Sequence, residues 1–329
     1  MLHARRGRAR APGSVALLAL AAAIVCTLAV PAARAEDVVR IGLPTKTYWP
    51  TIIAETALRQ KLFEKEGVKA ELTVYRSGGE AYEGLAAGAA DLILDPPALV
   101  AAGMNKGIAA KVVTGGALGY YGWHLMVKAD SKITQVAELE GKKVGITAAG
   151  SGSDFLALWT GVDRKVKFTR VPLGGGGLVP NLLSGNVDAV VLYSPLTFQM
   201  LQAKQARSIL DFGADVPAHL NSGWIATDKL IKEKPQVVQK AVNALYGGLV
   251  FLRTHPDVAV KMIAEIDEIP PEIAKAELEG NLVKLSADGE IKQEWVVRSL
   301  AFAEMTGMKD MAPADQIYLT TFKPVPTSP

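Results

Sequence analysis

The chain has 329 residues, is 49% hydrophobic and carries a formal net charge of +3, with four histidines and one cysteine. A single cysteine excludes an intramolecular disulfide, and the histidines lack the spacing of metal ligands, so neither a disulfide framework nor a transition-metal site is expected. A globular chain of this length buries a full hydrophobic core without such crosslinks.

Residues 1–35 are predicted to be a cleavable signal peptide. Four arginines within residues 1–10 precede an apolar run at 15–30 and the small-x-small pattern Ala33-Arg34-Ala35. The apolar run is shorter than the roughly 20 residues that a membrane span needs, so a retained anchor is the less favoured alternative. Removing this leader, which has five arginines and no acid, changes the net charge from +3 to −2. The basic composition therefore gives no reason to expect nucleic-acid binding.

Apolar runs bounded by glycine and proline predict two α/β lobes. In the first lobe we expect strands at 38–43, 69–75 and 109–115 and helices at 51–66 and 98–106. In the second lobe we expect a short helix at 136–141, strands at 143–147 and 166–171, and a helix that opens at 154–159.

One strand–turn–helix–strand pattern occurs twice, at 74–94 and at 171–192. Each copy has a valine, a glycine pair, a leucine, a glycine and an aspartate in the same register; the aspartates are Asp91 and Asp188. We expect these aspartates to bond to the backbone of the turn. A tandem strand–helix–strand unit predicts two similar lobes that face each other across a cleft.

Two Gly-Trp steps, at Trp123 and Trp224, each precede a short apolar strand, and these strands are predicted to cross between the lobes as a hinge. Residues 36–122 with 224–329 then form the first lobe, and residues 123–223 the second. The pattern from Pro235 onward is helical, with prolines at first helical turns. Four helices, expected at 236–253, 257–265, 272–284 and 292–306, should pack on the first lobe.

The enzyme motifs that can be tested on this sequence are incomplete. Residues 145–150 have phosphate-loop spacing, but Ser151 stands where that loop needs lysine. A dinucleotide fingerprint that starts at Gly150 fails at Phe155, and there is no Gly-x-Ser-x-Gly elbow. No catalytic residue, cofactor or metal is therefore assigned.

Small-residue loops at strand ends suit the capture of a ligand instead. Residues 77–80, 148–154 and 174–177 are rich in glycine and serine, which lets backbone approach a ligand closely. Free N–H groups at a helix start attract oxygen atoms. Ser153 and Asp154 could alternatively serve only as helix caps. Because strand carboxyl ends face the crevice in open α/β sheets, these loops are expected to converge there.

Aromatic residues gather beside the same loops, although aromatics are only 6% of the chain. A flat or ring-bearing ligand between such side chains would explain this clustering; covering the hinge is the alternative for the tryptophans. Asp95, before Pro96-Pro97, could accept hydrogen bonds from a ligand amine or could cap the next helix. The candidate ligand-binding residues are Tyr48, Trp49, Ser77, Gly78, Asp95, Pro96, Trp123, Ser151, Ser153, Asp154, Tyr193 and Trp224.

At these residues the chain resembles the periplasmic solute-binding proteins of nitrate/sulfonate/taurine-type ABC importers, a group that includes binders of thiamine-precursor pyrimidines. The carriers are the loop–helix stretches 77–91 and 171–189 and the sequence Val136-Ala-Glu-Leu-Glu-Gly-Lys-Lys-Val-Gly145. The resemblance implies a two-lobed receptor that closes on its solute. By match to the family's cleft loops it implies contacts from Tyr48, Trp49, Ser77, Gly78, Asp95, Pro96, Ser151, Ser153 and Tyr193.

Two departures from the family pattern bear on the solute. Asp95 places an acid where many relatives have a neutral residue, and Asp154 adds a second acid. A bare inorganic anion such as nitrate is therefore disfavoured, and a small organic solute with a ring or amine and an acceptor group fits better.

The expected function is that of a periplasmic, monomeric solute-binding subunit that delivers its ligand to the transmembrane subunits of an ABC permease. A ligand-sensing subunit for a membrane kinase is one alternative. A bilobal enzyme of the pyrimidine-precursor type is another, although the cleft loops lack the histidine and cysteine groups that such chemistry needs.

Overall fold

The computed structural model describes residues 1–3 and 37–325, so the predicted signal peptide lies outside the described residues. Among the described residues, no helix has both the length and the apolar character that crossing a bilayer requires. The chain from Asp37 onward forms a separate compact unit, and the fold below is the fold of that unit.

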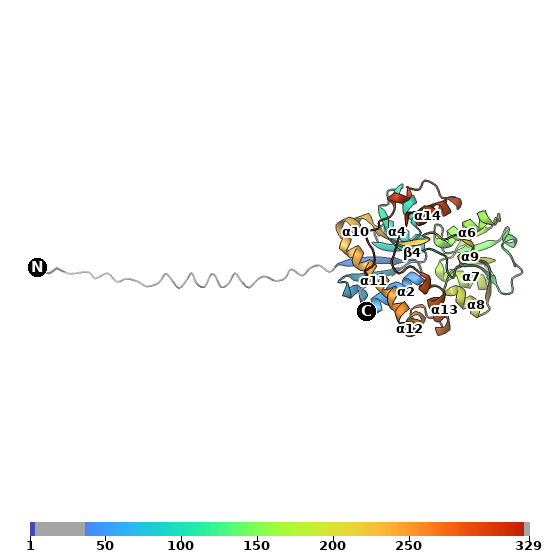
Figure 1. The fold of residues 1–329 in the computed structure, drawn as a ribbon, viewed down its shortest axis with the longest axis horizontal. Coiled ribbons are helices and arrows are strands. Elements are labelled where there is room, and N and C mark those ends of the chain that lie inside the picture. Colours follow the sequence, from blue (N-terminus) through green and yellow to red (C-terminus); the bar gives the residue numbers. More distant parts are fainter. Residues whose placement is uncertain (4–36, 326–329) are drawn as a thin grey trace. The chain divides into compact units, whose positions relative to one another are not determined.

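Ten strands form two five-stranded sheets of the same topology (Figure 1). The first sheet has the order β2-β1-β3-β10-β4, with β1 at Val38–Leu43, β2 at Lys69–Val74, β3 at Leu92–Asp95, β4 at Ala110–Ala117 and β10 at Ser222–Thr227. The second has the order β7-β6-β8-β5-β9, with β5 at His124–Lys128, β6 at Lys143–Ile146, β7 at Thr169–Pro172, β8 at Ala189–Leu192 and β9 at Ala206–Asp211. In each sheet the first three strands in the order run parallel. The next strand, β10 or β5, is antiparallel and separates them from the last strand, β4 or β9. The expected α/β class with two mixed sheets is confirmed.

The sequence repeat forms one strand–helix–strand unit in each sheet. The first copy is β2, α4 (Gly78–Ala86) and β3; the second is β7, the short helix η2 (Gly175–Gly177), α7 (Leu178–Ser184) and β8. Asp91 accepts a hydrogen bond from the backbone N–H of Arg40 at 3.1 Å, and Asp188 accepts one from Lys143 at 2.8 Å. Each aspartate thus ties the end of its repeat to the neighbouring central strand, and not to the backbone of its own turn as expected.

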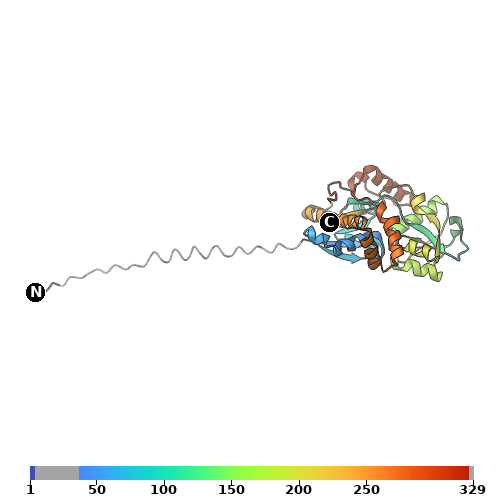
Figure 2. The same ribbon diagram turned by 60° about the horizontal axis from the view of Figure 1, so that its bottom comes forward.

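Helices cover the sheets (Figures 1 and 2). On the first sheet, α2 (Trp49–Arg59) packs against the long helix α11 (Pro235–Thr254). Gly248 permits this close approach, because a Cβ at that position would lie 2.7 Å from the backbone oxygen of Ile53. The remaining helices named below are α5 (Pro97–Met104), α6 (Gly152–Asp163), α8 (Leu196–Gln202), α9 (Phe212–Asp215), α12 (Pro256–Asp267), α13 (Pro271–Gly280) and α14 (Gln293–Met305).

The structure differs from the expected helices in two places. The single helix expected at 51–66 is two helices, α2 and α3 (Leu62–Lys65), because Lys61 adopts a left-handed conformation with φ 56°. The helix expected at 272–284 ends at Gly280, and a 3₁₀ turn, Leu282–Lys284, follows.

The chain leaves the first sheet after β4 and enters the second at β5; it returns through α9 to β10. The C-terminal helices do not pack on the first sheet alone. Helix α13 contacts α8, and α14 contacts both α5 and α6 (Figure 1). These helices therefore join the layers of the two sheets. The lobe boundaries at 122/123 and 223/224 stay a prediction.

Candidate ligand-binding site

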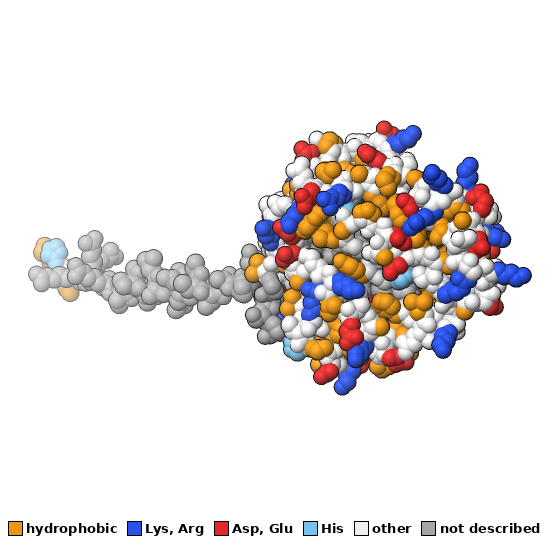
Figure 3. Space-filling view, turned by 45° about the vertical axis from the view of Figure 1, so that its right-hand side comes forward, with side chains coloured by type: hydrophobic (Ala, Val, Ile, Leu, Met, Phe, Trp, Pro, Cys, Tyr) orange, Lys and Arg blue, Asp and Glu red, His pale blue; other side chains and the backbone are white. Residues whose placement is uncertain are grey.

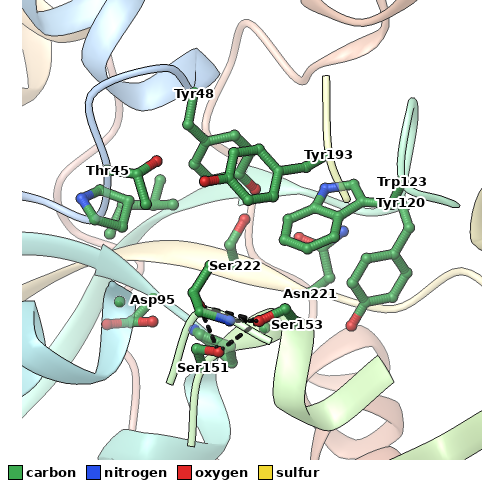
Figure 4. A pocket seen from close by; sticks show the side chains of 16 residues that line it. Thr45, Tyr48, Asp95, Tyr120, Trp123, Ser151, Ser153, Tyr193, Asn221 and Ser222 are labelled. Carbon is green, nitrogen blue, oxygen red and sulfur yellow. Dashed lines mark hydrogen bonds between the residues drawn. The ribbon is translucent and has the colours of Figure 1, made fainter. Parts of the chain in front are cut away.

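A pocket of about 470 Å³, including space open to solvent, lies where the carboxyl ends of strands from both sheets meet (Figure 4). Loops after β1, β3, β6 and β8 and the segments that connect the sheets line it. The lining residues are Pro44, Thr45, Tyr48, Gly78, Leu94, Asp95, Pro96, Tyr120, Trp123, Thr147, Ser151, Gly152, Ser153, Tyr193, Asn221 and Ser222.

Three aromatic side chains form one wall of the pocket. Tyr48 precedes α2, Trp123 precedes β5 and Tyr193 follows β8. The ring centroids of Tyr48 and Trp123 are 5.7 Å apart in a T-shaped arrangement, and Tyr193 lies 5.0 Å from each of them. These separations are typical of favourable aromatic pairs, so the wall is a packed cluster rather than three independent rings.

Hydroxyl groups form a second wall, at the start of α6 (Figure 4). Thr147 Oγ1 donates to Ser151 Oγ at 2.8 Å and lies 3.0 Å from Ser153 Oγ, and the two serine oxygens are 2.8 Å apart. The Ser153 hydroxyl also accepts from the backbone N–H of Thr147 at 2.9 Å, and Ser151 Oγ caps the helix by accepting from Asp154 N at 3.4 Å. The end of β6 is thereby fixed to the first turn of α6.

Asp95 is the acidic group of the pocket. It ends β3, its relative exposure is 3%, and its Oδ2 has no hydrogen-bond partner among the described residues. Burial raises the pKa of this carboxyl well above its ordinary value. The first residue of α4 must be small here, because a Cβ on Gly78 would lie 2.4 Å from Asp95 Oδ1.

Unpartnered polar atoms concentrate in this pocket. Of the ten buried side-chain atoms without a hydrogen-bond partner among the described residues, four belong to its lining: Thr45 Oγ1, Asp95 Oδ2, Tyr193 OH and Ser222 Oγ. A buried polar group without a partner costs about 1–3 kcal/mol, so four around one cavity indicate a place built for polar contacts with a ligand.

Eight of the predicted contact residues line the pocket. They are Tyr48, Gly78, Asp95, Pro96, Trp123, Ser151, Ser153 and Tyr193. The structure thus brings them together from both sheets, while their contact with a ligand stays a prediction.

The other four predicted residues do not line it, and each has another partner. Ser77 caps α4 by accepting from Glu80 N at 3.1 Å. Asp154 accepts from Gly150 N at 2.9 Å and forms an ion pair with Arg170. Trp49 and Trp224 line a separate pocket of about 220 Å³, including space open to solvent, between the first sheet and its helices. A residue in a helix or a strand beside a cleft can point either into the cleft or into the core. The proximity of Trp49 and Trp224 to the predicted cleft loops in the sequence therefore did not determine the direction of their side chains.

The lining also contains residues outside the predicted set: Pro44, Thr45, Leu94, Tyr120, Thr147, Gly152, Asn221 and Ser222. Thr147 directly follows β6, and Thr45 lies two residues after the equivalent opening strand β1, so the similarity of the two strand ends was a usable signal. Asn221 and Ser222 had no such signal, because they approach the pocket at the amino end of an antiparallel strand.

The loops of the two sheets touch each other around the pocket. The backbone N–H of Gly175, in η2, donates to the carbonyl of Arg76 at 2.8 Å. A Cβ on Gly175 would lie 2.6 Å from both Thr45 Cγ2 and Tyr193 OH. Ser151, Ser153 and Tyr193 are each at most 2% exposed, so these loop contacts leave little of the hydroxyl and aromatic walls accessible.

The chain belongs to the NMT1/THI5-like family, whose model matches residues 52–259. The resemblance found in the sequence is thereby confirmed at the level of the superfamily. A protein of Brucella abortus (strain 2308) that is named a binding protein is 26% identical over 305 residues, which are 89% of this chain and 90% of that protein. A Bacillus subtilis (strain 168) protein named for binding aliphatic sulfonates is 25% identical over 240 residues, 72% of each chain.

Solved structures confirm the two-lobed fold of periplasmic binding proteins. The alkanesulfonate-binding protein SsuA from Xanthomonas axonopodis pv. citri, bound to MOPS, has a TM-score of 0.76 at 17% identity over 87% of this chain and 99% of its own. The desulfurization enzyme DSZB, in complex with biphenyl-2-sulfinic acid, has a TM-score of 0.60 at 16% identity over 87% and 97%. The fold alone therefore accommodates both a binding protein and an enzyme.

Proposed function

We propose that this protein is the extracytoplasmic solute-binding subunit of an ABC importer and that it closes its two lobes on a small organic solute. The observation that carries the proposal is the buried pocket between the two sheets, with an aromatic wall, a hydroxyl wall and four unpartnered polar atoms. Membership in the NMT1/THI5-like family and the relatives named for binding support it.

The proposed mechanism is a population shift between open and closed forms. In the structure the Gly175–Arg76 hydrogen bond and the packing of Gly175 on Thr45 and Tyr193 hold the loops together. A solute that contacts residues of both sheets at once, such as Asp95 and Ser151, interacts more strongly with the closed form, and so it favours closure. The connections at 118–123 and 212–221 would serve as the hinge.

The proposed location is the periplasm, reached through the signal peptide at 1–35, and the proposed partners are the permease subunits, with the protein acting as a monomer. On the face in Figure 3, lysine and arginine side chains are interspersed with aspartate and glutamate. Such a mixed surface does not favour a nucleic-acid partner.

An enzyme is the second candidate, because a desulfinase of Rhodococcus erythropolis is 32% identical over 83 residues, 25% of this chain. The proposal is nevertheless a non-catalytic role. The pocket lining contains no histidine, lysine, arginine or cysteine, so none of these nucleophiles, acids or bases is placed against a solute. The signalling alternative, presentation of the closed form to a membrane kinase, uses the same pocket.

The test is a thermal-shift screen of the full chain, expressed with its own leader, against sulfonates, amines, amino acids, pyrimidines and aromatic acids. We expect at least one compound to raise the melting temperature and to change tryptophan fluorescence through Trp123. The Trp123→Phe variant should lose that fluorescence change, whereas Trp295→Phe, at a half-buried site on α14 outside the pocket, should keep it. A fluorescence response that survives Trp123→Phe would place the binding site elsewhere, and the absence of any stabilising compound would contradict the proposed function.

A further inference from the structure

We infer that Asp95 binds a positively charged nitrogen group of the solute, so that the pocket selects compounds carrying an ammonium or a protonated ring nitrogen. The inference rests on the proposed function, because it names the chemical class that the same pocket takes. It adds two statements to the proposed function: Asp95 determines specificity, and the solute carries a positive charge.

The first observation is that the Asp95 carboxylate has no countercharge in the protein. None of the lining residues is lysine, arginine or histidine. Among the described residues, no ion pair and no side-chain hydrogen bond involves this carboxylate, and its Oδ2 is buried without a partner. By contrast, Asp154 pairs with Arg170 and Asp91 pairs with Arg40. A cationic partner is the usual solution for a buried carboxylate. Asp95 shares the lack of such a partner with the buried Asp267 and Glu277, and of these three acids only Asp95 lines the pocket, where a ligand can supply one.

The second observation explains why the local backbone does not satisfy this carboxylate. An aspartate at a strand end ordinarily accepts a hydrogen bond from the backbone N–H two residues later or from a helix start. Here the next two residues are Pro96 and Pro97, which have no N–H to donate. Helix α5 begins at Pro97, so its N-terminus presents proline rings where amide groups would otherwise lie. No hydrogen bond joins the Asp95 carboxylate to the start of α5 among the described residues, so Asp95 does not cap that helix in this structure.

The third observation is the chemistry that surrounds the carboxylate in the same cavity. The Tyr48, Trp123 and Tyr193 rings offer π faces, which attract cations. The Thr45 and Ser222 hydroxyl oxygens lack partners and can accept hydrogen bonds from N–H groups. Among the titratable side chains of the described residues, Tyr82 of α4 has an electrostatic interaction with Asp95, and this group is neutral near pH 7 because burial raises its pKa to about 12. A compact cation fits every one of these features.

A neutral Asp95 that donates a proton to an anionic solute is the competing account, and pH separates the two. Burial raises the pKa of Asp95, which favours a bound proton on this carboxyl in the solute-free closed form. A cation must displace that proton, so its affinity should rise with pH until the cation itself loses its charge. An anion held by the protonated carboxyl should instead bind more weakly as pH rises.

The experiment compares matched probes on the full chain expressed with its own leader. Benzylammonium, benzyl alcohol and phenylmethanesulfonate share a benzyl group, and propylammonium, propanol and propanesulfonate share a propyl chain. Calorimetry measures each affinity at pH 6 and pH 8. We expect the ammonium member of a set to bind tightest and to bind better at pH 8. In Asp95→Asn its affinity should fall by about 100-fold or more, which is a loss of at least about 2.8 kcal/mol, because the bound cation keeps no buried countercharge. Asp130→Asn, an exposed carboxylate paired with Lys128, is the control and should change nothing.

Tighter binding of a sulfonate that weakens with pH and survives Asp95→Asn would overturn the inference while leaving the proposed function intact. No binding by any of the six probes or the compounds of the wider screen would contradict the proposed function itself. The melting temperature without ligand shows whether the variant folds. Asp95→Asn removes an unpaired buried acid, so it should melt no lower than the wild type at pH 8. A clear drop in its melting temperature would show that Asp95 has a protein partner and would also overturn the inference.

Discussion

At the scale of single residues, the site shows that similar loop positions carry different tasks. Ser77 and Ser151 each lie at a strand-to-helix turn, after β2 and after β6, and each caps its helix. Yet only Ser151 lines the pocket. The same holds for the two acids near the cleft, since Asp154 is neutralised by Arg170 whereas Asp95 is not. Residue type and spacing indicate that a side chain caps a helix or contacts a ligand. Which of the two roles it has depends on a partner residue that comes from another strand.

Asp154 is therefore expected to matter for stability and not for binding. Asp154→Ala removes an acceptor of the Gly150 N–H and a buried half of the Arg170 ion pair, and it should lower the free energy of unfolding by about 2 kcal/mol. Solute affinity should stay within about threefold of the wild type, because a change under 0.7 kcal/mol is expected for a residue without contact. Urea unfolding and calorimetry measure the two quantities.

The matched control for this prediction is Asp163→Ala, at the other end of α6. Its carboxylate is 41% exposed and pairs with Arg164 at 3.1 Å, so its removal should cost about 0.5 kcal/mol or less. A strong loss of affinity in Asp154→Ala with normal stability would return Asp154 to the ligand contacts.

At the scale of elements, the glycine turn of the second repeat copy is the part that closes the pocket. Gly175 and Gly176 are neighbours in η2, but only Gly175 faces the pocket lining. A Cβ at 175 would lie 2.6 Å from Tyr193 OH and Thr45 Cγ2, whereas a Cβ at 176 meets nothing within 4 Å. The two positions therefore separate the effect of closure from the effect of adding a methyl group to the turn.

We expect Gly175→Ala to hold the loops apart and to weaken solute binding by tenfold or more, since an overpacked contact costs about 1–3 kcal/mol. Gly176→Ala should bind like the wild type. Calorimetry gives the affinities, and small-angle scattering with and without solute reports whether each variant still becomes more compact. Equal affinities for the two variants would contradict the role of this turn in closure.

Much of the element order could be predicted from the sequence, because the repeat and the turn glycines are local signals. Gly42 and Gly145, for example, lie in the equivalent central strands β1 and β6, where a Cβ would approach neighbouring side chains within about 3 Å. The break at Lys61 could not be predicted, because its left-handed conformation has no glycine or asparagine to mark it. The burial of Trp49 and Trp224 in the core was also beyond local reasoning, since it depends on which face of α2 meets α11 and on the side of β10.

At the scale of the whole molecule, the C-terminal helices are the feature that local patterns describe least well. Helical periodicity predicts their lengths but not that α13 and α14 reach the helices of the second sheet. Near this contact, Asn281 Nδ2 donates both to Glu277 Oε1 at 2.7 Å and to Ser194 Oγ, after β8, at 3.0 Å. Two acids are buried nearby: Glu277 has 0% relative exposure and Asp267 has 4%, and each has carboxylate oxygen without a partner.

These two acids make the stability of the molecule depend on pH. Burial raises the pKa of Glu277 to about 7, and burial together with the charge of Glu277 raises the pKa of Asp267 to about 8. The unfolded chain loses both protons near pH 4, so the folded state binds more protons than the unfolded state between about pH 4 and pH 8. The free energy of unfolding therefore falls as pH rises through this window, and the wild type should melt at a higher temperature at pH 5.5 than at pH 8.5.

Glu277→Gln tests this account, because the amide keeps an oxygen acceptor for Asn281 and cannot ionise. The variant should melt above the wild type at pH 8.5, and its melting temperature should differ less between pH 5.5 and pH 8.5. The glutamine does not titrate, and it no longer places a negative charge beside Asp267. Glu279→Gln, an exposed residue of the same helix paired with Lys275, should keep the wild-type pH dependence. If Glu277→Gln melts below the wild type at pH 8.5, the ionised glutamate has a favourable partner in the folded protein. That result would contradict the pH dependence argued here.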